Sequence, residues 1–408
     1  MNLVKYTDRK NTDCAKWDGL ENSFSRNDLM AMWVADMDFC VPECVSNALK
    51  KYVDMGAFGY YVPPAAYYDS FIEWERRYHG YEVRREWIRF APGVVPAFNW
   101  LVQILAGKGE AVAVMPPVYY PFMKAVENNG RKLVMCPLLL TDDGYIMDYE
   151  GFEAAIVRED VKLFIFCSPH NPVGRVWKKE EISRMLEICR KHHVYVLSDE
   201  IHHDIIMSGN RHVPAATAGS GEYDSILVTL TAATKTFNLA AVQNSIVIIP
   251  DEKIRKEWDD FTDGIRMTGG NAFGYVAVRA AYEDGRPWLN ELLEIIEGNY
   301  RYLRGRLEEA LPDVRVADLE GTYLMWIDLS AYMDKIIAMA AGVLSKDSSA
   351  GDEAVTAMQH FMEDECGMAV DYGSWFGGKE YAGCIRVNLA TRRENIEFAA
   401  DRIINLLS

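Results

Sequence analysis

An alternation of strand and helix patterns, from about residue 110 to residue 250, restricts the fold of this chain more than any other feature. In its clearest unit, an apolar run at residues 161–167 is followed by an amphipathic segment at residues 179–192 and a second apolar run at residues 194–198. Apolar residues in the middle segment recur at the spacing of one helix face: Ile182, Met185, Leu186 and Cys189. A strand, a helix and a strand in this order predict an α/β fold with a mainly parallel sheet.

Further apolar runs of strand length extend the pattern on both sides of this unit. They lie at residues 111–115, 226–230 and 245–249. We assign these runs, and the helical patterns between them, to a large domain at residues 51–286. With 408 residues, of which 50% are hydrophobic, the chain can bury a substantial core and form two domains.

The C-terminal part of the chain follows a different pattern. A long helical pattern at residues 288–311 is followed by strand-like runs around residues 314–316, 322–329 and 384–389. We expect residues 287–408 to form a smaller α+β domain, to which an N-terminal segment at residues 1–50 contributes. The polar, turn-prone stretch at residues 344–352 predicts a surface loop.

Charge and hydropathy narrow the class of partner. A net charge of −17 would repel nucleic-acid phosphates and provides no basic face for an anionic membrane. Residues 1–10 lack the apolar core of a signal peptide, and no apolar stretch is long enough to span a bilayer. We therefore expect a cytoplasmic protein whose partner is a small molecule.

The cysteines and histidines do not predict a metal site. The 8 cysteines are scattered, and the closest pair, Cys40 and Cys44, has no second Cys or His pair to complete a zinc site. We expect them to be reduced thiols. His202 and His203 are adjacent at a strand end, where neighbouring side chains point to opposite faces and make poor joint ligands.

Three polar residues follow predicted parallel strands and point to the chemistry. Asn171, Asp199 and Lys235 each come just after an apolar run. The carboxyl ends of parallel strands meet at one edge of a sheet, where open α/β folds bind ligands, so we expect these side chains to lie together. A pyridoxal 5'-phosphate enzyme needs three such groups. They are a lysine amine that can bond to an aldehyde, a carboxylate that keeps a pyridine nitrogen protonated, and an amide that binds a ring hydroxyl. Lys235 is therefore the predicted catalytic residue.

Two more segments suit the same cofactor. Residues 92–100 predict a tight turn that leads into a helix, where the free N–H groups of Val94 and Val95 and the helix dipole would bind a phosphate dianion. The turn Pro116-Pro117 follows another strand and precedes Tyr119 and Tyr120, so an aromatic ring can stack on the pyridine ring. Of these two tyrosines we favour Tyr119.

Short motifs are spread along nearly the whole chain. They are Lys16-Trp17-Asp18, Met32-Trp33-Val34-Ala35-Asp36-Met37-Asp38-Phe39, Phe58-Gly59-Tyr60, Pro116-Pro117-Val118-Tyr119, Pro169-His170-Asn171-Pro172-Val173-Gly174-Arg175-Val176-Trp177, Asp199-Glu200-Ile201-His202, Lys235-Thr236-Phe237-Asn238, Glu320-Gly321-Thr322-Tyr323-Leu324 and Arg386-Val387-Asn388-Leu389-Ala390. With them the chain resembles the fold-type-I pyridoxal phosphate enzymes. Within that group it is similar to the cystathionine β-lyase-like carbon–sulfur lyases of the MalY/PatB group, in the class I/II aminotransferase superfamily.

The resemblance implies roles for the residues around the ring. It pairs Asp199 with the pyridine nitrogen and Asn171 with the ring hydroxyl, and it stacks Tyr119 on the ring. His202 lies where the wider fold type often has a tyrosine that contacts the ring hydroxyl. Thr234 replaces the usual serine of the family and can still donate its hydroxyl to the phosphate.

Two residues outside this set also follow from the resemblance. Tyr60 would reach the phosphate of the neighbouring subunit, which implies a homodimer with shared active sites. Arg386 matches the family arginine that holds the substrate α-carboxylate, and a guanidinium fork suits a carboxylate through two parallel hydrogen bonds.

The chain also departs from the family pattern. Ala233 and Ala241 stand where the group commonly has Pro and Gly, and Asp371-Tyr372-Gly373 replaces a more usual Ser-Pro-Gly. The segment between Asp328 and Val370 is roughly twenty residues longer than in typical relatives, so we expect an added helix or a flap near the site.

Three functions are compatible with these residues. The first is a β-lyase that eliminates a thiol from L-cystathionine or cysteine-type amino acids and releases pyruvate and ammonia. The second is an aminotransferase, which shares every step up to the removal of the Cα proton. The third is a regulatory binding protein on the same fold. The chemical motifs do not separate the first two, and the resemblance favours the lyase.

Overall fold

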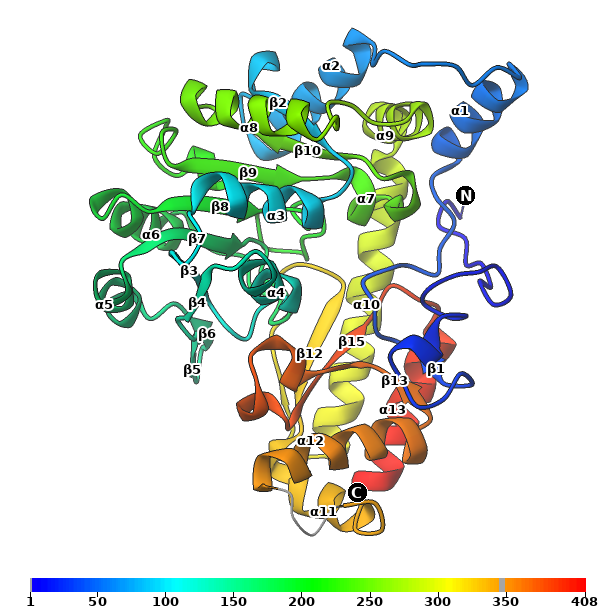
Figure 1. Cartoon of the computed structure of the whole chain (residues 1–408). Helices are drawn as coiled ribbons and strands as arrows, with labels where there is room; N and C mark the ends of the chain where they lie inside the picture. The colour runs from blue at the N-terminus through cyan, green and yellow to red at the C-terminus, as the bar shows by residue number, and fades with distance from the viewer. Residues whose placement is uncertain (1, 345–348) are drawn as a thin grey trace.

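A seven-stranded sheet forms the centre of the computed structural model, which describes residues 2–344 and 349–408 (Figure 1). The strands lie in the order β2-β10-β9-β8-β7-β3-β4, and all neighbours are parallel except at β10, which runs antiparallel to both β9 and β2. The strands are β2 (Ile88–Ala91), β3 (Ala111–Val114), β4 (Lys132–Met135), β7 (Val161–Cys167), β8 (Tyr195–Asp199), β9 (Leu227–Thr231) and β10 (Ser245–Ile248). The predicted α/β fold with a mainly parallel sheet is confirmed.

Both faces of this sheet are buried, as the sequence of β7 shows. Leu163 and Ile165 pack into one apolar core, and Phe164 and Phe166 pack into the core on the opposite face. A continuous apolar run is what a parallel strand covered by helices on both sides requires. One face is covered by α3 (Val94–Leu105), α4 (Tyr120–Asn128) and α8 (Glu252–Gly264), and the other by α5 (Tyr149–Glu159), α6 (Lys179–Lys191) and α9 (Ala272–Asp284).

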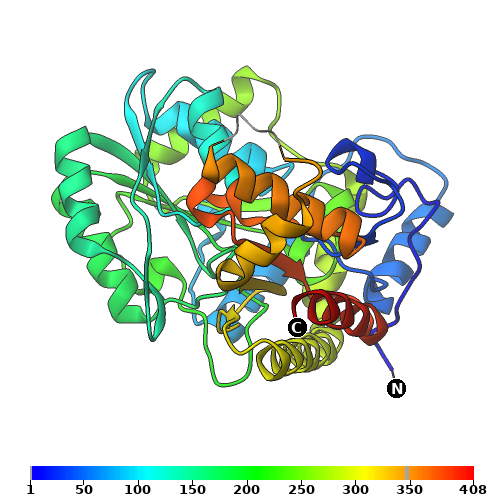
Figure 2. The ribbon, with the colours of Figure 1, turned by 90° about the horizontal axis from the view of Figure 1, so that it is seen from below.

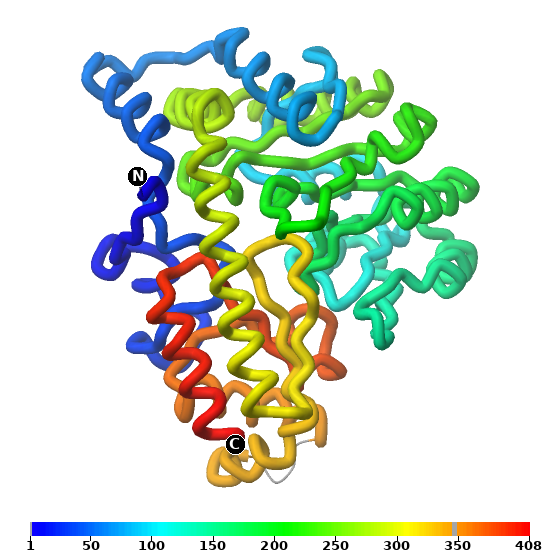
Figure 3. The backbone as a smooth tube through the Cα atoms, turned by 180° about the vertical axis from the view of Figure 1, so that it is seen from behind, coloured from blue at the N-terminus to red at the C-terminus, as the bar shows by residue number. Residues whose placement is uncertain are grey.

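A second, antiparallel sheet lies in the C-terminal part, in the order β11-β12-β15-β14. Its strands are β11 (Arg315–Val316), β12 (Leu324–Asp328), β14 (Asp371–Tyr372) and β15 (Cys384–Asn388). The long helix α10 (Arg286–Ala310) leads from the large sheet into this part, where it lies beside α13 (Arg393–Leu407) (Figure 3). The strands β11, β12 and β15 and the helix α10 agree with the predicted runs to within a few residues, whereas β14 was not predicted.

The N-terminal segment is tied to the C-terminal part of the chain. The strand β1 (Met30–Ala31) pairs in parallel with β13 (Met368–Ala369), and Asn388 Nδ2 donates to the carbonyl of Asp36 at 2.8 Å. These contacts support the proposed assignment of the first residues to the smaller domain. The proposed boundary at residue 50 falls inside α1 (Glu43–Asp54), which packs on α9 together with α2 (Ala65–Trp74).

The expectation of a loop at residues 344–352 is partly wrong. Residues 345–348 lie outside the described part of the chain, but Ala350 begins helix α12 (Ala350–His360). Ser349 is its N-cap and accepts a hydrogen bond from the Asp352 amide at 3.3 Å. A serine before two acidic first-turn residues is a helix start signal, which the polar composition of the stretch concealed.

The long segment after Asp328 adds helices, as the extra length predicts. They are α11 (Met333–Met339), α12 and a π-helical turn at Phe361–Glu365. Figures 1 and 2 place α11 and α12 at the end of the small sheet that lies away from the large sheet, so the expected position near the site is wrong for these two helices. None of the helices in the described residues is both long and apolar enough to cross a bilayer.

Candidate active site

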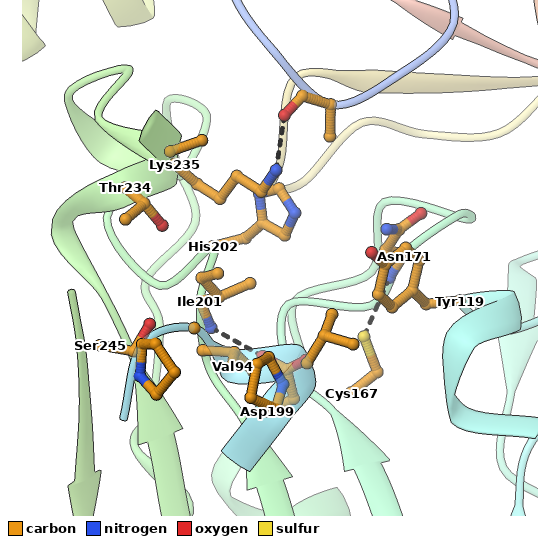
Figure 4. Close-up of a pocket in the computed structure, with 16 residues that line it drawn as sticks. Val94, Tyr119, Cys167, Asn171, Asp199, Ile201, His202, Thr234, Lys235 and Ser245 are labelled. Carbon is orange, nitrogen blue, oxygen red and sulfur yellow. Dashed lines mark hydrogen bonds between the residues drawn. The ribbon is translucent and has the colours of Figure 1, made fainter. Parts of the chain in front are cut away.

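A cavity of about 210 Å³ lies where β7, β8 and β9 end, next to the start of α3 (Figure 4). The parallel strands bring their carboxyl ends to one edge, as the sequence predicts. Eight of the predicted residues line the cavity: Lys235, Asp199, Asn171, Tyr119, His202, Thr234, Val94 and Val95.

Lys235 lies in the short helix α7 (Ala233–Thr236), immediately after β9. Its Nζ donates to the carbonyl oxygen of Ala35 at 2.5 Å, and burial lowers the pKa of the ammonium to about 8, against the attraction of Asp36. The Asn238 side chain holds the segment that carries Ala35, because its Nδ2 donates to the carbonyl of Phe39 at 2.9 Å. An amine with this pKa is partly uncharged near neutral pH, which suits a nucleophile or a base.

Asp199 is the last residue of β8 and is buried at the bottom of the cavity. Its Oδ1 accepts a hydrogen bond from the Ile201 amide at 3.1 Å. Burial nevertheless raises the pKa of the carboxyl to about 7, and the neighbouring Glu200 acts in the same direction. A protonated ring nitrogen placed against Asp199 would supply the positive charge that the buried carboxylate needs to stay ionised.

Asn171 and Tyr119 form the side of the cavity opposite Lys235 in Figure 4. The Tyr119 amide donates to the Asn171 carbonyl at 3.0 Å, which fixes the two residues relative to each other. Burial raises the pKa of Tyr119 well above its usual value, so its ring stays neutral. The Asn171 Oδ1 accepts from Arg386 at 2.6 Å, which leaves its Nδ2 group to donate to a ligand.

Several polar groups at the far end of the cavity are not used by the protein. Val94 and Val95 form the first turn of α3, after Gly93, whose N-cap position provides no side chain to accept from their amides. The Ser245 hydroxyl is buried and has no hydrogen-bond partner within the described part of the chain. The buried Nδ1 atom of His202, beside Lys235 in Figure 4, also lacks a partner there, but it lies away from this end of the cavity. Free amides, a hydroxyl and a helix start are what a phosphate group would satisfy, so these residues fit pyridoxal 5'-phosphate.

His202 and His203 point in different directions, as expected for neighbours at a strand end. His202 lines the cavity, and burial lowers its pKa well below the usual value. His203 faces Glu75 at 3.2 Å and Asp204 at 3.4 Å, and although burial opposes it, these carboxylates raise its pKa to about 10. The ligand atoms of Glu75, His79 and His203 lie within 4.8 Å of one another, and we interpret the group as a buried ion-pair network because Asp204 also accepts from His79 at 2.8 Å.

Two predicted residues lie outside the cavity. Arg386, on β15, is buried behind Asn171 and is joined to it by a hydrogen bond. Tyr60 is fully exposed, in a stretch that also exposes Phe58 and Val62. The sequence reasoning missed four groups at or beside the site, which are the Ala35 carbonyl, Cys167, Ser245 and Asp371.

The sequence profile described as aminotransferase class I and II matches residues 27–403 of the chain. The chain belongs to this family. The cystathionine beta-lyase PatB of Bacillus subtilis strain 168 is 42% identical to this chain over 332 residues, which cover 81% of this chain and 86% of PatB. Membership in the class I and II aminotransferase family agrees with the resemblance read from the motifs.

Solved structures agree over the whole length. The pyridoxal phosphate-bound C-S lyase of Staphylococcus hominis is 31% identical, with a TM-score of 0.89. The match covers 100% of this chain and 98% of the lyase. Cystalysin of Treponema denticola, which contains pyridoxal 5'-phosphate, is 32% identical, with a TM-score of 0.88. The match covers 99% of this chain and 98% of cystalysin. The predicted fold type is therefore confirmed.

Proposed function

We propose that the protein is a pyridoxal 5'-phosphate-dependent carbon–sulfur β-lyase. It converts L-cystathionine and L-cysteine-type amino acids, with one water, to pyruvate, ammonia and a thiol by α,β-elimination followed by hydrolysis. One observation carries the proposal: a buried amine of lowered pKa and a buried carboxyl of raised pKa line one cavity at the carboxyl edge of the sheet. This cavity belongs to a chain that is 42% identical to the cystathionine beta-lyase PatB.

When bound, pyridoxal 5'-phosphate supplies an aldehyde that bonds to an amine and a protonated ring that accepts electrons. Asp199 binds the ring nitrogen, because it is the buried carboxylate of the cavity. Asn171 and His202 donate to the ring hydroxyl, and Tyr119 packs against the ring. The phosphate is held by the groups at the far end of the cavity, which are the amides of Val94 and Val95 and the hydroxyls of Thr234 and Ser245.

Lys235 moves the protons of the reaction. Its uncharged Nζ takes the proton from Cα of the substrate, and the resulting ammonium gives a proton to the sulfur as the Cβ–S bond breaks. A pKa of about 8 suits both steps, since the group can hold or release a proton near neutral pH. Arg386 orients the substrate through its α-carboxylate, so that the Cα–H bond faces Lys235.

The active form is a homodimer with shared sites, in which Tyr60 contacts the phosphate held by the other subunit. The exposure of Tyr60, Phe58 and Val62 supports this proposal, because neighbouring large apolar side chains are seldom left in water without a partner surface. All cysteines in the structure are free thiols, which supports a cytoplasmic location.

Incubation with L-cystathionine alone tests the proposal. Wild-type holoenzyme should form pyruvate without any keto acid, and Lys235→Ala should form none above the background of free cofactor. Substrate consumption that depends on an added keto acid would identify an aminotransferase instead, because that reaction must return the cofactor to its aldehyde form.

A further inference from the structure

Asp371 binds Arg386, the arginine that we propose holds the α-carboxylate of the substrate. Asp371 on β14 lies directly opposite Arg386 on β15 in the antiparallel pairing of the two strands. One guanidinium NH2 donates to Asp371 Oδ2, and the NH1 group donates to Asn171 Oδ1 at 2.6 Å. Each of the two terminal nitrogens that would form a fork around a ligand carboxylate therefore already makes one hydrogen bond within the chain.

The pair is closed off from water. The side chains of Arg386 and Asp371 are 2% and 1% exposed, and the centroid of the Phe376 ring lies 4.9 Å from the guanidinium carbon. The Nε atom of Arg386 has no partner among residues 2–344 and 349–408. A buried carboxylate that loses its cation is strongly disfavoured, so Asp371 does not give up Arg386 without a cost.

Hydrogen bonds of the neighbouring residue Tyr372 fix the position of the strand that carries Asp371. The Tyr372 hydroxyl donates to Glu363 Oε1 at 2.6 Å, and Glu363 Oε2 accepts from the Ser25 amide at 2.7 Å. These bonds tie β14 to the π-helical turn that ends the long segment and to the N-terminal segment. The backbone that carries Asp371 is therefore fixed, which keeps its side chain against Arg386. A ligand carboxylate has to compete with Asp371 for the guanidinium.

We propose that Asp371 is a specificity-determining residue that competes with the substrate α-carboxylate for Arg386. The inference rests on the proposed carboxylate-binding role of Arg386. A substrate carboxylate replaces or shares the contact of Asp371, so it contributes less to affinity than it would at an unoccupied arginine. The rest of the amino acid must provide the remaining affinity.

The alternative is that Asp371 has a purely structural role, as the charge partner that allows Arg386 to be buried. The two interpretations predict different effects on ligand affinity of Asp371→Asn, which keeps the acceptor oxygen and removes the charge. If the pair is only structural, the variant loses stability and binds ligands no better. If Asp371 competes with the ligand, the variant binds α-carboxylates more tightly.

Calorimetric titration of the holoenzyme with 2-methylalanine distinguishes them, because this amino acid lacks a Cα proton and cannot turn over. We expect Asp371→Asn to bind it about tenfold more tightly than wild type, from the value of a charge-assisted hydrogen bond. The amide of 2-methylalanine has no carboxylate, so its affinity should be the same for both proteins. Asp371→Ser serves as a second variant if the Asn form does not fold.

Equal affinity of wild type and both variants for 2-methylalanine would overturn the proposal, as would an equal gain for the acid and its amide. A failure of every protein to bind the acid would also overturn it, because Arg386 would then bind no α-carboxylate. Pyruvate formation from L-cystathionine by the wild type is measured separately. The proposed lyase activity is therefore tested independently of the role of Asp371.

Discussion

We predict that Asp199→Asn makes the cofactor-free protein more stable, although it removes most of the turnover. Burial raises the pKa of the Asp199 carboxyl from 3.8 to about 7. The folded chain therefore binds this proton more tightly than the unfolded chain does. The free energy of unfolding falls as the pH rises from the unfolded pKa to the folded pKa, and it stays at the lower level above that pH.

The magnitude follows from these two pKa values. A difference of about 3 pKa units, at about 1.36 kcal/mol each, destabilises the folded protein by about 4 kcal/mol at pH 8. At pH 5 only about 1.5 kcal/mol of this cost is present, because the folded carboxyl is still protonated. The stability advantage of Asn over Asp should thus grow by about 2 to 3 kcal/mol from pH 5 to pH 8.

Urea unfolding of the two cofactor-free proteins at both pH values measures this difference. Bound pyridoxal 5'-phosphate should reduce the advantage of Asn, because its protonated ring nitrogen stabilises the Asp199 carboxylate and not the amide. An Asn variant that is no more stable than wild type at pH 8, or whose advantage is the same at pH 5, would refute the reasoning.

Four further changes test other parts of the account. Lys235→Ala should abolish the yellow absorption that the wild type acquires with pyridoxal 5'-phosphate, and a colourless wild type would contradict the cofactor assignment. Asp38→Asn leaves the buried Lys16, now 2.9 Å from Asp38, without its charge partner, so the free energy of unfolding in urea should fall by about 3 to 5 kcal/mol; a loss below about 1 kcal/mol would show that the pair is dispensable. Arg386→Lys keeps the charge but loses the fork, so steady-state kinetics with L-cystathionine should show KM raised about tenfold or more, and an unchanged KM would place the carboxylate elsewhere. Mixed Lys235→Ala and Tyr60→Phe subunits should regain activity in hybrid dimers, whereas activity no higher than the average of the two parents would mean that the sites are not shared.

The strand-end residues of the site could be predicted from the sequence because parallel strands all end at one edge. Asp199 ends β8, and Asn171 and Lys235 follow β7 and β9, so the pattern of the sheet was enough to bring them together. Ser245 shows where this reasoning stops. It begins β10, and only because β10 runs antiparallel does its first residue reach the same edge. An apolar run does not reveal the direction of its strand.

Contacts made by the backbone, or fixed by register, were also hidden from the sequence. Ala35 binds Lys235 through its carbonyl oxygen, which every residue has, so its side chain gives no signal. Asp371 was recognised as a departure from the family pattern, but its pairing with Arg386 depends on the register of two short strands. The helix start at Ser349 was missed because a capping serine in a polar stretch is also typical of a loop.

The ratio of products from a single incubation with L-cystathionine tests the central claim most directly. With no keto acid present, we expect one pyruvate and one free thiol for each substrate consumed, over many turnovers of the holoenzyme. Added 2-oxoglutarate should change neither the rate nor the ratio. A reaction that stops after one turnover and resumes only with 2-oxoglutarate would contradict the lyase and establish an aminotransferase.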